Sequence, residues 1–286
     1  MPSACYSLPR GCSPWRPLLL LSLAVLLVVV LHALRNELIR RQVQFSAEVA
    51  LSALVADGAA VVASAVLAST GGAPSPSVAE FTRLLSANEK KAWLQTPRYT
   101  SRGYQTARLP QRLRKDLAQF HAASRPAPEG EGGSTPHLHG HVFVASMSGH
   151  ALEPRLAAFL HGLLSDWTGQ RELDFVNSYG PRTYTRGSSL SAHGDRPRTH
   201  ALSAVVFVAA ENLSAPWPLQ IVANGTAGAD LVHEVFLGAG AEVLLYESTQ
   251  PHGRVTPLAG DSFTAIFFHW RPAGWTEHVD QLLRDS

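Results

Sequence analysis

The residues best suited to chemistry in this sequence are two histidines and an aspartate, His193, Asp195 and His252. His193 and Asp195 stand two positions apart, and residues so spaced in a strand point to the same face of a sheet. A second imidazole, from His252, lies 57 residues further along the chain. Two imidazoles and one carboxylate suit Fe(II), because they occupy one face of the ion and leave the other positions open. We therefore predict a metal site formed by these three residues.

Cysteine usage limits any metal site to histidine and carboxylate ligands. Cys5 and Cys12, the two cysteines of the chain, both lie near the amino terminus. Disulfides, thiolate metal sites and a cysteine nucleophile are therefore excluded from the rest of the chain. The net charge of +2 comes without a run of Lys or Arg, so we expect no nucleic-acid partner.

The pattern after Gly169 predicts the strands that must position these ligands. Short apolar runs recur there, separated by Gly, Pro, Asn and Asp. The runs are 173–176, 204–209, 219–222, 231–236, 242–246 and 263–269. Many short strands with turn signals between them indicate a β-sandwich or barrel. In such a fold, 57 residues between Asp195 and His252 are enough for several strands to return to the starting edge.

Helices are expected to precede the β-rich region. Apolar residues at helical spacing mark one face of a helix over 152–167, and Gly169 is its expected stop. Further helices are predicted at 36–68, 78–93 and 109–120, and a short strand at 141–145. Residues 94–107 look irregular, and 125–136 read as a flexible linker or exposed loop. The fold class is therefore α+β, with helices first and strands last.

Residues 17–34 form an uncharged, Leu- and Val-rich run bounded by Arg16 and Arg35. At about 1.5 Å per residue, a helix of this length nearly crosses a hydrocarbon core of about 30 Å. An uncleaved transmembrane signal anchor is the favoured interpretation. A cleaved signal peptide remains open, although no clean small-x-small cleavage site follows. A buried core helix is disfavoured because the run is apolar on every face.

These features divide the chain into four parts. They are a short tail at 1–16, the signal anchor at 17–34, a helix-rich stalk and linker region at 35–136, and a globular domain at 137–286 with its core at 173–272. Two sequons, Asn212-Leu-Ser and Asn224-Gly-Thr, favour a domain in the lumen of the endoplasmic reticulum or Golgi. Positive charges on the two sides of the anchor leave its orientation open.

Further motifs surround the predicted ligands in a fixed order. They are Tyr184 nine positions before His193, Thr199-His200-Ala-Leu-Ser203 after Asp195, Trp217-Pro-Leu, Tyr246-Glu-Ser, His252-Gly-Arg254 and the closing run Phe263-Thr-Ala-Ile-Phe-Phe-His269-Trp-Arg-Pro. In order and spacing, residues 173–272 resemble the prolyl 4-hydroxylase-like branch of the 2-oxoglutarate/Fe(II)-dependent dioxygenases. The first 170 residues carry no such match.

The resemblance implies a double-stranded β-helix, or jelly-roll, as the catalytic domain within 137–286. It implies Fe(II) on His193, Asp195 and His252, with 2-oxoglutarate and O₂ as cosubstrates, succinate and CO₂ as products, and ascorbate as an optional accessory. Tyr184 is expected to give a hydroxyl to 2-oxoglutarate. The far carboxylate of 2-oxoglutarate needs a cation or several donors, because an unpaired buried charge is costly.

The chain departs from this family at the residue that holds the far carboxylate. In the prolyl 4-hydroxylases a lysine serves there, ten positions after the distal histidine, whereas Ser262 stands at that position here. Arg254 has the same strand parity as His252, and its guanidinium suits a bidentate carboxylate contact. We expect Arg254 to bind the carboxylate, with Ser262 assisting by a hydrogen bond and Arg271 in reserve. The alternative is that Arg254 faces solvent.

Other histidines admit two interpretations on the sequence alone. His200 and His269 stand near the predicted ligands and are expected either to support them or to pack in the core. The run His137-Leu-His139-Gly-His141 could bind a metal, but its position beside a Gly-rich linker favours a surface loop.

Three functions remain open at this stage. The first is hydroxylation of a peptidyl residue such as proline, and the second is the same chemistry on a small molecule or lipid. The third is a non-catalytic, cupin-like binding module, which the intact triad argues against and the missing lysine favours. Residues 17–34 imply a membrane as a partner, and the oligomeric state is not predicted.

Overall fold

The computed structural model describes residues 76–129, 136–225 and 229–284. The predicted tail, signal anchor and 36–68 helix lie outside the described residues. Among the helices that are described, none is both long and apolar enough to cross a membrane.

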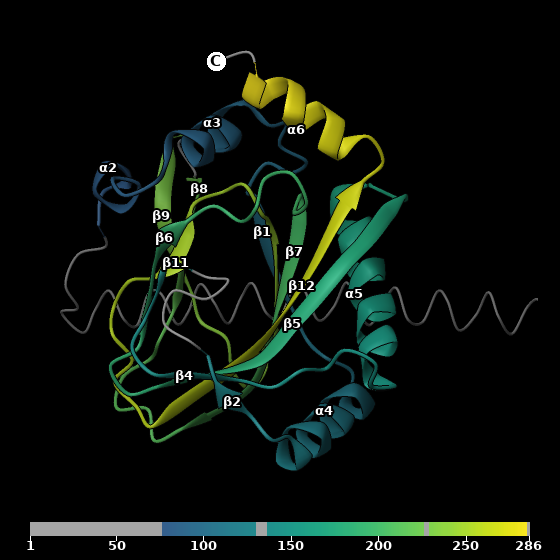
Figure 1. Cartoon of the computed structure of the whole chain (residues 1–286), viewed down its shortest axis with the longest axis vertical. Coiled ribbons are helices and arrows are strands. Elements are labelled where there is room, and N and C mark those ends of the chain that lie inside the picture. Colours follow the sequence, from purple (N-terminus) through teal and green to yellow (C-terminus); the bar gives the residue numbers. More distant parts are fainter. Residues whose placement is uncertain (1–75, 130–135, 226–228, 285–286) are drawn as a thin grey trace, which may run out of the picture. The chain divides into compact units, whose positions relative to one another are not determined.

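Two antiparallel sheets form the body of the described domain (Figure 1). The seven-stranded sheet runs in the order β1 (Tyr104–Ala107), β10 (Val243–Glu247), β7 (Leu202–Glu211), β12 (Ser262–Pro272), β5 (Leu173–Thr185), β4 (Val142–Val144) and β2 (Ala127–Pro128). The five-stranded sheet runs β3 (Leu138–His139), β6 (Ser189–His193), β11 (His252–Arg254), β8 (Leu219–Asn224) and β9 (Asp230–Val235). This arrangement is consistent with a jelly-roll, and the six predicted strands after Gly169 are all present.

The core lies between the sheets because each sheet turns apolar side chains inward. Val205 and Leu244 come from the larger sheet, and Leu219 and Ile221 from the smaller one, in a single buried cluster. Full burial of such a side chain stabilises the fold by about 1.5–3 kcal/mol. The space between the two sheets is therefore filled by apolar side chains.

Helices cover the larger sheet and its ends. Helix α5 (Leu152–Thr168) buries Leu156, Leu160 and Leu164 and runs alongside β5 in Figure 1. It ends where Gly169 adopts a left-handed conformation with φ of 76°, as the sequence predicts. Helix α4 (Gln111–Ala123) confirms the helix predicted from residue 109 onward, and α6 (Trp275–Arg284) closes the described chain.

The single helix predicted over 78–93 is wrong, because the chain forms two helices there. Helix α2 (Val78–Phe81) and α3 (Ala87–Gln95) each begin with a capping box, in which a serine and the glutamate three residues later bond to each other's backbone N–H. The first helix ends at its C-cap, Thr82, and the second box starts at Ser86, whose extended backbone begins α3. A Ser-x-x-Glu pair inside an apolar pattern was the signal for this break.

Two segments expected to lack regular structure contribute edge strands. Strand β1 lies within 94–107 and pairs with β10, and β2 lies within 125–136 and pairs with β4. Both strands are too short to show a local sequence pattern, and they form because a distant strand pairs with them. The strand predicted at 141–145 is confirmed as β4.

Candidate metal centre

The three predicted ligands converge at one point between the sheets. His193 ends β6 and His252 begins β11, and the two are direct partners in antiparallel register. Asp195 follows β6 by two residues, so the turn after the strand, rather than the strand itself, aims its carboxylate. One nitrogen of each histidine and one carboxylate oxygen lie within 4.8 Å of one another. This spacing allows all three atoms to bind a single ion.

Backbone carbonyls orient both imidazoles in the same way. The His193 Nδ1 donates to the Ser191 carbonyl at 2.9 Å, and the His252 Nδ1 donates to the Gln250 carbonyl at 2.9 Å. A carbonyl only accepts, so each Nδ1 carries the ring proton and each Nε2 keeps a lone pair. The His252 Nε2 faces the Asp195 Oδ1 at 3.6 Å. Both rings thus have the tautomer that a metal ion requires.

The carboxylate of Asp195 uses its two oxygens differently. Oδ2 accepts a hydrogen bond from the Tyr246 hydroxyl at 2.8 Å and from the Ser203 hydroxyl at 3.3 Å. Oδ1 faces His252. Because one oxygen is held by hydroxyls, the other is left for a cation.

The protonation of the ligands follows from their surroundings. Burial, together with the nearby His252, lowers the pKa of His193 to about 3, so its imidazole is neutral near pH 7. Burial raises the pKa of Asp195, but His252, together with His269 and His200, outweighs burial and leaves the pKa well below its usual range. Burial lowers the pKa of His252, but the facing Asp195 outweighs it and the net pKa is raised. The raised pKa means that the Nε2 of His252 binds a proton more readily. A cation between His252 and Asp195 would compete with that proton for the Nε2 lone pair.

The loops that carry the ligands are bonded to each other. The Asp195 N–H donates to the Ser248 carbonyl at 3.0 Å, and the Ser203 and Ser248 hydroxyls lie 2.6 Å apart. The Ser203 hydroxyl also lies 2.7 Å from the His269 Nδ1. The turn after β10, together with β7 and β12, therefore holds the Asp195 side of the site in place.

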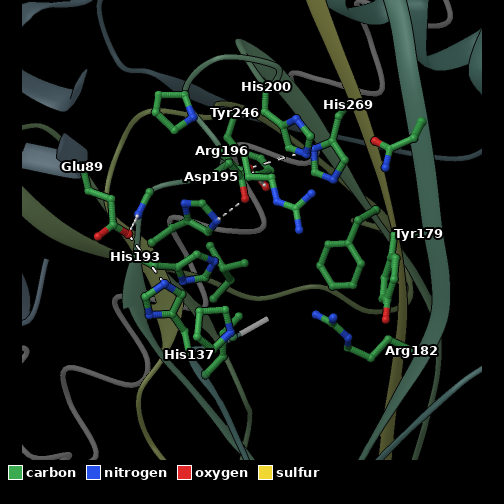
Figure 2. A pocket seen from close by; sticks show the side chains of 18 residues that line it. Glu89, His137, Tyr179, Arg182, His193, Asp195, Arg196, His200, Tyr246 and His269 are labelled. Carbon is green, nitrogen blue, oxygen red and sulfur yellow. Dashed lines mark hydrogen bonds and ion pairs between the residues drawn. The ribbon is translucent and has the colours of Figure 1, made fainter. Parts of the chain in front are cut away.

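A cavity of about 490 Å³ opens onto the ligands (Figure 2). Figure 2 places Glu89, His137 and His193 on one side of it and Tyr179 and Arg182 on the other. The remaining lining residues that bear polar groups are Asn177, Asp195, Arg196, His200, Tyr246, His252 and His269. The volume is in the range of small-molecule sites, about 300–1,000 Å³.

Arg254 and Tyr184 are both buried, and neither is among the residues that line this cavity. Arg254 is 3% exposed, and its guanidinium lies over the Trp217 ring at 4.6 Å and the Phe263 ring at 4.3 Å. Its Nη1 donates to the Trp217 carbonyl, whereas its Nη2 is buried with no hydrogen-bond partner among the described residues. The Tyr184 hydroxyl, on a side chain that is 1% exposed, likewise has no such partner. Burial lowers the pKa of Arg254 to about 10.

The structure does not bring Ser262 or Arg271 to the cavity. Ser262 is half-buried at the start of β12, where its hydroxyl donates to the Glu211 Oε2 at 3.2 Å. The Arg271 Nη1 donates to the Thr276 hydroxyl at 2.7 Å, beyond the far end of the same strand. Neither side chain lines the cavity beside the ligands.

The sequence left the positions of several cavity residues open or did not mark these residues. His137, interpreted there as part of a surface loop, stacks on the His193 ring with centroids 4.7 Å apart. His200 and His269 stack on each other at 3.8 Å, and burial lowers the pKa of both. Arg182 forms a buried ion pair with Glu129 at 2.8 Å. No local pattern marks such contacts, because their partners are brought together only by the fold.

Comparisons with known proteins find likeness in structure alone. No protein-family model matches the chain, and no curated protein does. HygX from Streptomyces hygroscopicus, solved with nickel and 2-oxoglutarate bound, is 15% identical with a TM-score of 0.45, over 60% of this chain and 84% of HygX. A prolyl-4-hydroxylase from Pseudomonas putida is 17% identical with a TM-score of 0.41, over 60% of this chain and 94% of that one.

A prolyl hydroxylase from Trichoplax adhaerens, in complex with a hypoxia inducible factor peptide fragment, is 15% identical with a TM-score of 0.40, over 68% of this chain and 93% of that one. A structure from Burkholderia pseudomallei named as a 2OG-Fe(II) oxygenase is similar at 11% identity and a TM-score of 0.40, over 55% of this chain and 76% of that one. At such identities and TM-scores the likeness carries no weight for function, which depends on this chain's own residues. The chain is thus similar to solved structures of 2-oxoglutarate/Fe(II) oxygenases, prolyl hydroxylases among them.

Proposed function

We propose that this protein is an Fe(II)- and 2-oxoglutarate-dependent dioxygenase that hydroxylates a C–H bond. The observation that carries the proposal is the convergence of His193, Asp195 and His252 within 4.8 Å, beside a cavity of about 490 Å³. Two neutral nitrogens and one carboxylate oxygen form the donor set of non-haem Fe(II) oxygenases, which leave coordination positions open. The residues present therefore fit the metal.

The residues also fit the cosubstrate. A bound 2-oxoglutarate would bring its far carboxylate to Arg254, whose buried Nη2 has no partner among the described residues. Arg254 lies two residues after His252, roughly 7 Å further along β11 and past an irregularity in its pairing with β6. Its strand partner Leu190 lines the cavity, which gives the carbon chain of the cosubstrate an apolar neighbour. Tyr184 is a second donor for the same carboxylate.

Arg182 is less suited to this task, although it does line the cavity. Its guanidinium and the Glu129 carboxylate form an ion pair at 2.8 Å, with both side chains 6% exposed. The positive charge is thus already balanced by a buried carboxylate. Arg254 has no carboxylate partner within the described ranges, so a dicarboxylate ligand would relieve the cost of burying its charge.

When bound, iron and 2-oxoglutarate supply the oxidising chemistry, in which one atom of O₂ enters the product alcohol and the other enters succinate as CO₂ is released. The protein holds both in position. Ser191 and Gln250 fix the imidazole tautomers, and Tyr246 and Ser203 fix the carboxylate. Burial of the site keeps bulk water from the reacting atoms.

For the substrate, we propose a peptidyl side chain, with proline as the first residue to test. A cavity of about 490 Å³ has room for a cosubstrate together with a group of side-chain size. Hydroxylation of a small molecule or lipid by the same chemistry is the alternative.

The decisive experiment measures succinate formed from 2-oxoglutarate by the purified protein with added Fe(II). We expect the wild type to form succinate and His193→Ala to remain at the no-enzyme background, because the variant lacks one ligand. Proline-containing peptides and small molecules are then supplied in turn, and a mass gain of one oxygen atom identifies the substrate class.

Each outcome of this experiment has a definite meaning. Equal succinate in wild type and His193→Ala would remove the enzyme claim and leave a cupin-like binding module. Mass gain on a small molecule and on none of the peptides would overturn the peptidyl assignment but not the chemistry.

For location, we propose a lumenal domain held by the membrane anchor at 17–34. Both amides donate a hydrogen bond, that of Asn212 to the Asp261 Oδ2 at 2.7 Å and that of Asn224 to the Ser101 carbonyl at 2.6 Å, but Asn212 is exposed whereas Asn224 is partly buried. In protein from a secretory pathway we therefore expect a glycan on Asn212, mapped by mass spectrometry after endoglycosidase treatment. Membrane-extracted protein without a glycan at either sequon would count against the lumenal topology.

A further inference from the structure

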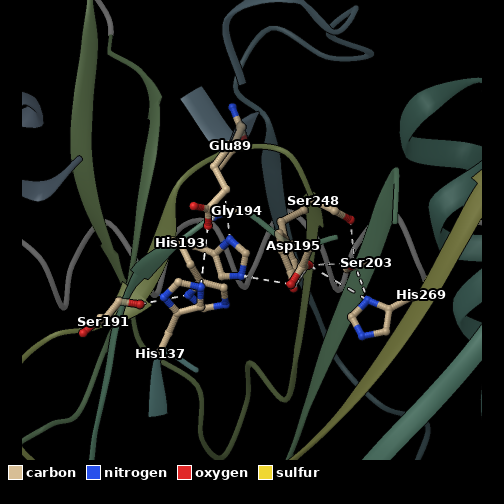
Figure 3. Close-up of polar contacts among 12 residues, drawn as sticks. Glu89, His137, Ser191, His193, Gly194, Asp195, Ser203, Ser248 and His269 are labelled. Atoms are coloured by element: carbon tan, nitrogen blue, oxygen red, sulfur yellow. Dashed lines mark hydrogen bonds and ion pairs between the residues drawn. The ribbon is translucent and has the colours of Figure 1, made fainter. Parts of the chain in front are cut away.

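Glu89 connects helix α3 to the loop that carries two of the metal ligands. Its Oε1 accepts a hydrogen bond from the N–H of Gly194, the residue between His193 and Asp195, at 3.1 Å. The same oxygen lies 3.7 Å from the Nε2 of His137, whose ring stacks on that of His193 (Figure 3). One carboxylate oxygen thus contacts both the backbone between the ligands and the ring beside one of them.

The second oxygen of Glu89 fixes the position of the first. Oε2 accepts from the Ser86 N–H at 2.8 Å and from the Ser86 hydroxyl at 2.6 Å, which completes the capping box of α3. The carboxylate is therefore held by the helix at one oxygen and holds the ligand loop with the other. A glutamine has only one acceptor oxygen and could serve one of these partners but not both.

The other end of α3 contacts the second ligand-bearing segment. The Thr96 hydroxyl donates to the Ala92 carbonyl at 2.6 Å, so the Thr249 hydroxyl, 2.9 Å away, is the donor in the bond between the two threonines. Thr249 lies three residues before His252, and its carbonyl packs against Gly194. Helix α3 and its C-cap thus contact the residue between His193 and Asp195 and a residue three positions before His252.

We propose that Glu89 is a positioning residue of the metal centre, and that α3 is part of the catalytic unit although it precedes the jelly-roll in the sequence. The proposal rests on the proposed function only for the identity of the metal. Glu89 sets the path of the backbone between His193 and Asp195, and hence the angle at which their side chains approach an ion. Partners of this kind typically change metal affinity by about 10–100-fold when removed.

The chain contains a matched control for this idea. Glu80 completes the same capping box in α2, with its Oε2 2.9 Å from the Ser77 nitrogen and 2.8 Å from the Ser77 hydroxyl. It does not line the cavity beside the ligands. Replacing either glutamate with alanine removes the capping hydrogen bonds of one helix. Only the replacement of Glu89 also removes the hydrogen bond to Gly194, in the loop that carries the ligands.

The test is titration of the purified full chain with Co(II), followed by its visible d–d absorption. His193→Ala defines the signal that comes from the triad. We expect Glu89→Ala to raise the dissociation constant about 10–100-fold and to alter the spectrum, and Glu80→Ala to match the wild type in both. Glu89→Gln, which keeps the size of the side chain, should give a smaller rise in the same direction.

Circular dichroism of each variant shows whether the fold is kept, and Glu89→Gln decides the question if Glu89→Ala does not fold. Wild-type affinity and spectrum in both folded Glu89 variants would overturn the proposal. A Co(II) signal that does not depend on His193 would overturn the metal centre and this inference together. Absence of succinate formation, with the Co(II) results as expected, would refute the dioxygenase activity and leave the positioning role of Glu89 intact.

Discussion

Replacing Asp195 with alanine should abolish succinate formation and weaken Fe(II) binding by more than about 100-fold, because even outer partners of metal ligands cost about 10–100-fold when removed. Asp195 is the only carboxylate in the triad, so its loss leaves a dication facing two neutral imidazoles. The buried hydroxyl of Tyr246 would also lose its acceptor. Unpaired buried polar groups cost about 1–3 kcal/mol each, so a moderate loss of stability should accompany the loss of metal.

Two further variants separate charge from shape at this position. Asp195→Asn keeps an acceptor for Tyr246 but lacks the negative charge, so it should fold and still fail to turn over. Asp195→Glu keeps the charge but moves it, and we expect impaired activity. Asp261→Ala, which removes an exposed carboxylate paired with Arg186, is the control and should retain activity. Succinate formation near the wild-type rate in any Asp195 variant would show that the iron site is elsewhere.

The metal ligands could be predicted from the sequence because their residue types and their spacing both suit a metal site. A histidine and an aspartate two positions apart, followed by short strands and a distant histidine, are enough to suggest a closed β-fold around a metal. The structure explains why the two histidine ligands converge, because His193 and His252 are direct partners on neighbouring strands. The expectation that Asp195 lies within the strand was wrong, because β6 ends at His193.

The support of the site could not be predicted in the same way. Glu89 contacts Gly194 over a separation of 105 residues, and Glu129 contacts Arg182 over 53. Each pair is brought together by the packing of a peripheral segment on the barrel, and the charged members look like ordinary surface charges in their local sequence. Capping boxes are the exception, because Ser86 and Glu89 stand three apart and mark a helix start from the sequence alone.

Arg254 is the residue through which the cosubstrate proposal is most directly tested. Arg254→Ala should raise the 2-oxoglutarate concentration for half-maximal succinate formation by about two orders of magnitude. Loss of one partner of a buried charge pair costs about 2–5 kcal/mol, and each 1.4 kcal/mol is a factor of about ten. Binding of Co(II), which involves only the triad, should change little.

The choice of variants distinguishes a carboxylate contact from a packing role. Arg254 lies over the rings of Trp217 and Phe263, so alanine also removes packing. Arg254→Lys keeps the charge and much of the aliphatic stem but loses the two-pronged guanidinium, and it should therefore fall between wild type and alanine in its demand for 2-oxoglutarate. Arg186→Ala, on an exposed residue paired with Asp261, is the matched control.

Affinity for Co(II) and the requirement for 2-oxoglutarate respond differently to a structural defect and to the loss of a carboxylate contact. A structural defect would weaken Co(II) and 2-oxoglutarate binding together, because both depend on the alignment of β11 with β6. A lost carboxylate contact raises the requirement for 2-oxoglutarate alone. An unchanged requirement in a folded Arg254→Ala variant would mean that another donor holds the far carboxylate. Arg182, released from Glu129, is then the next cation of the cavity wall to replace.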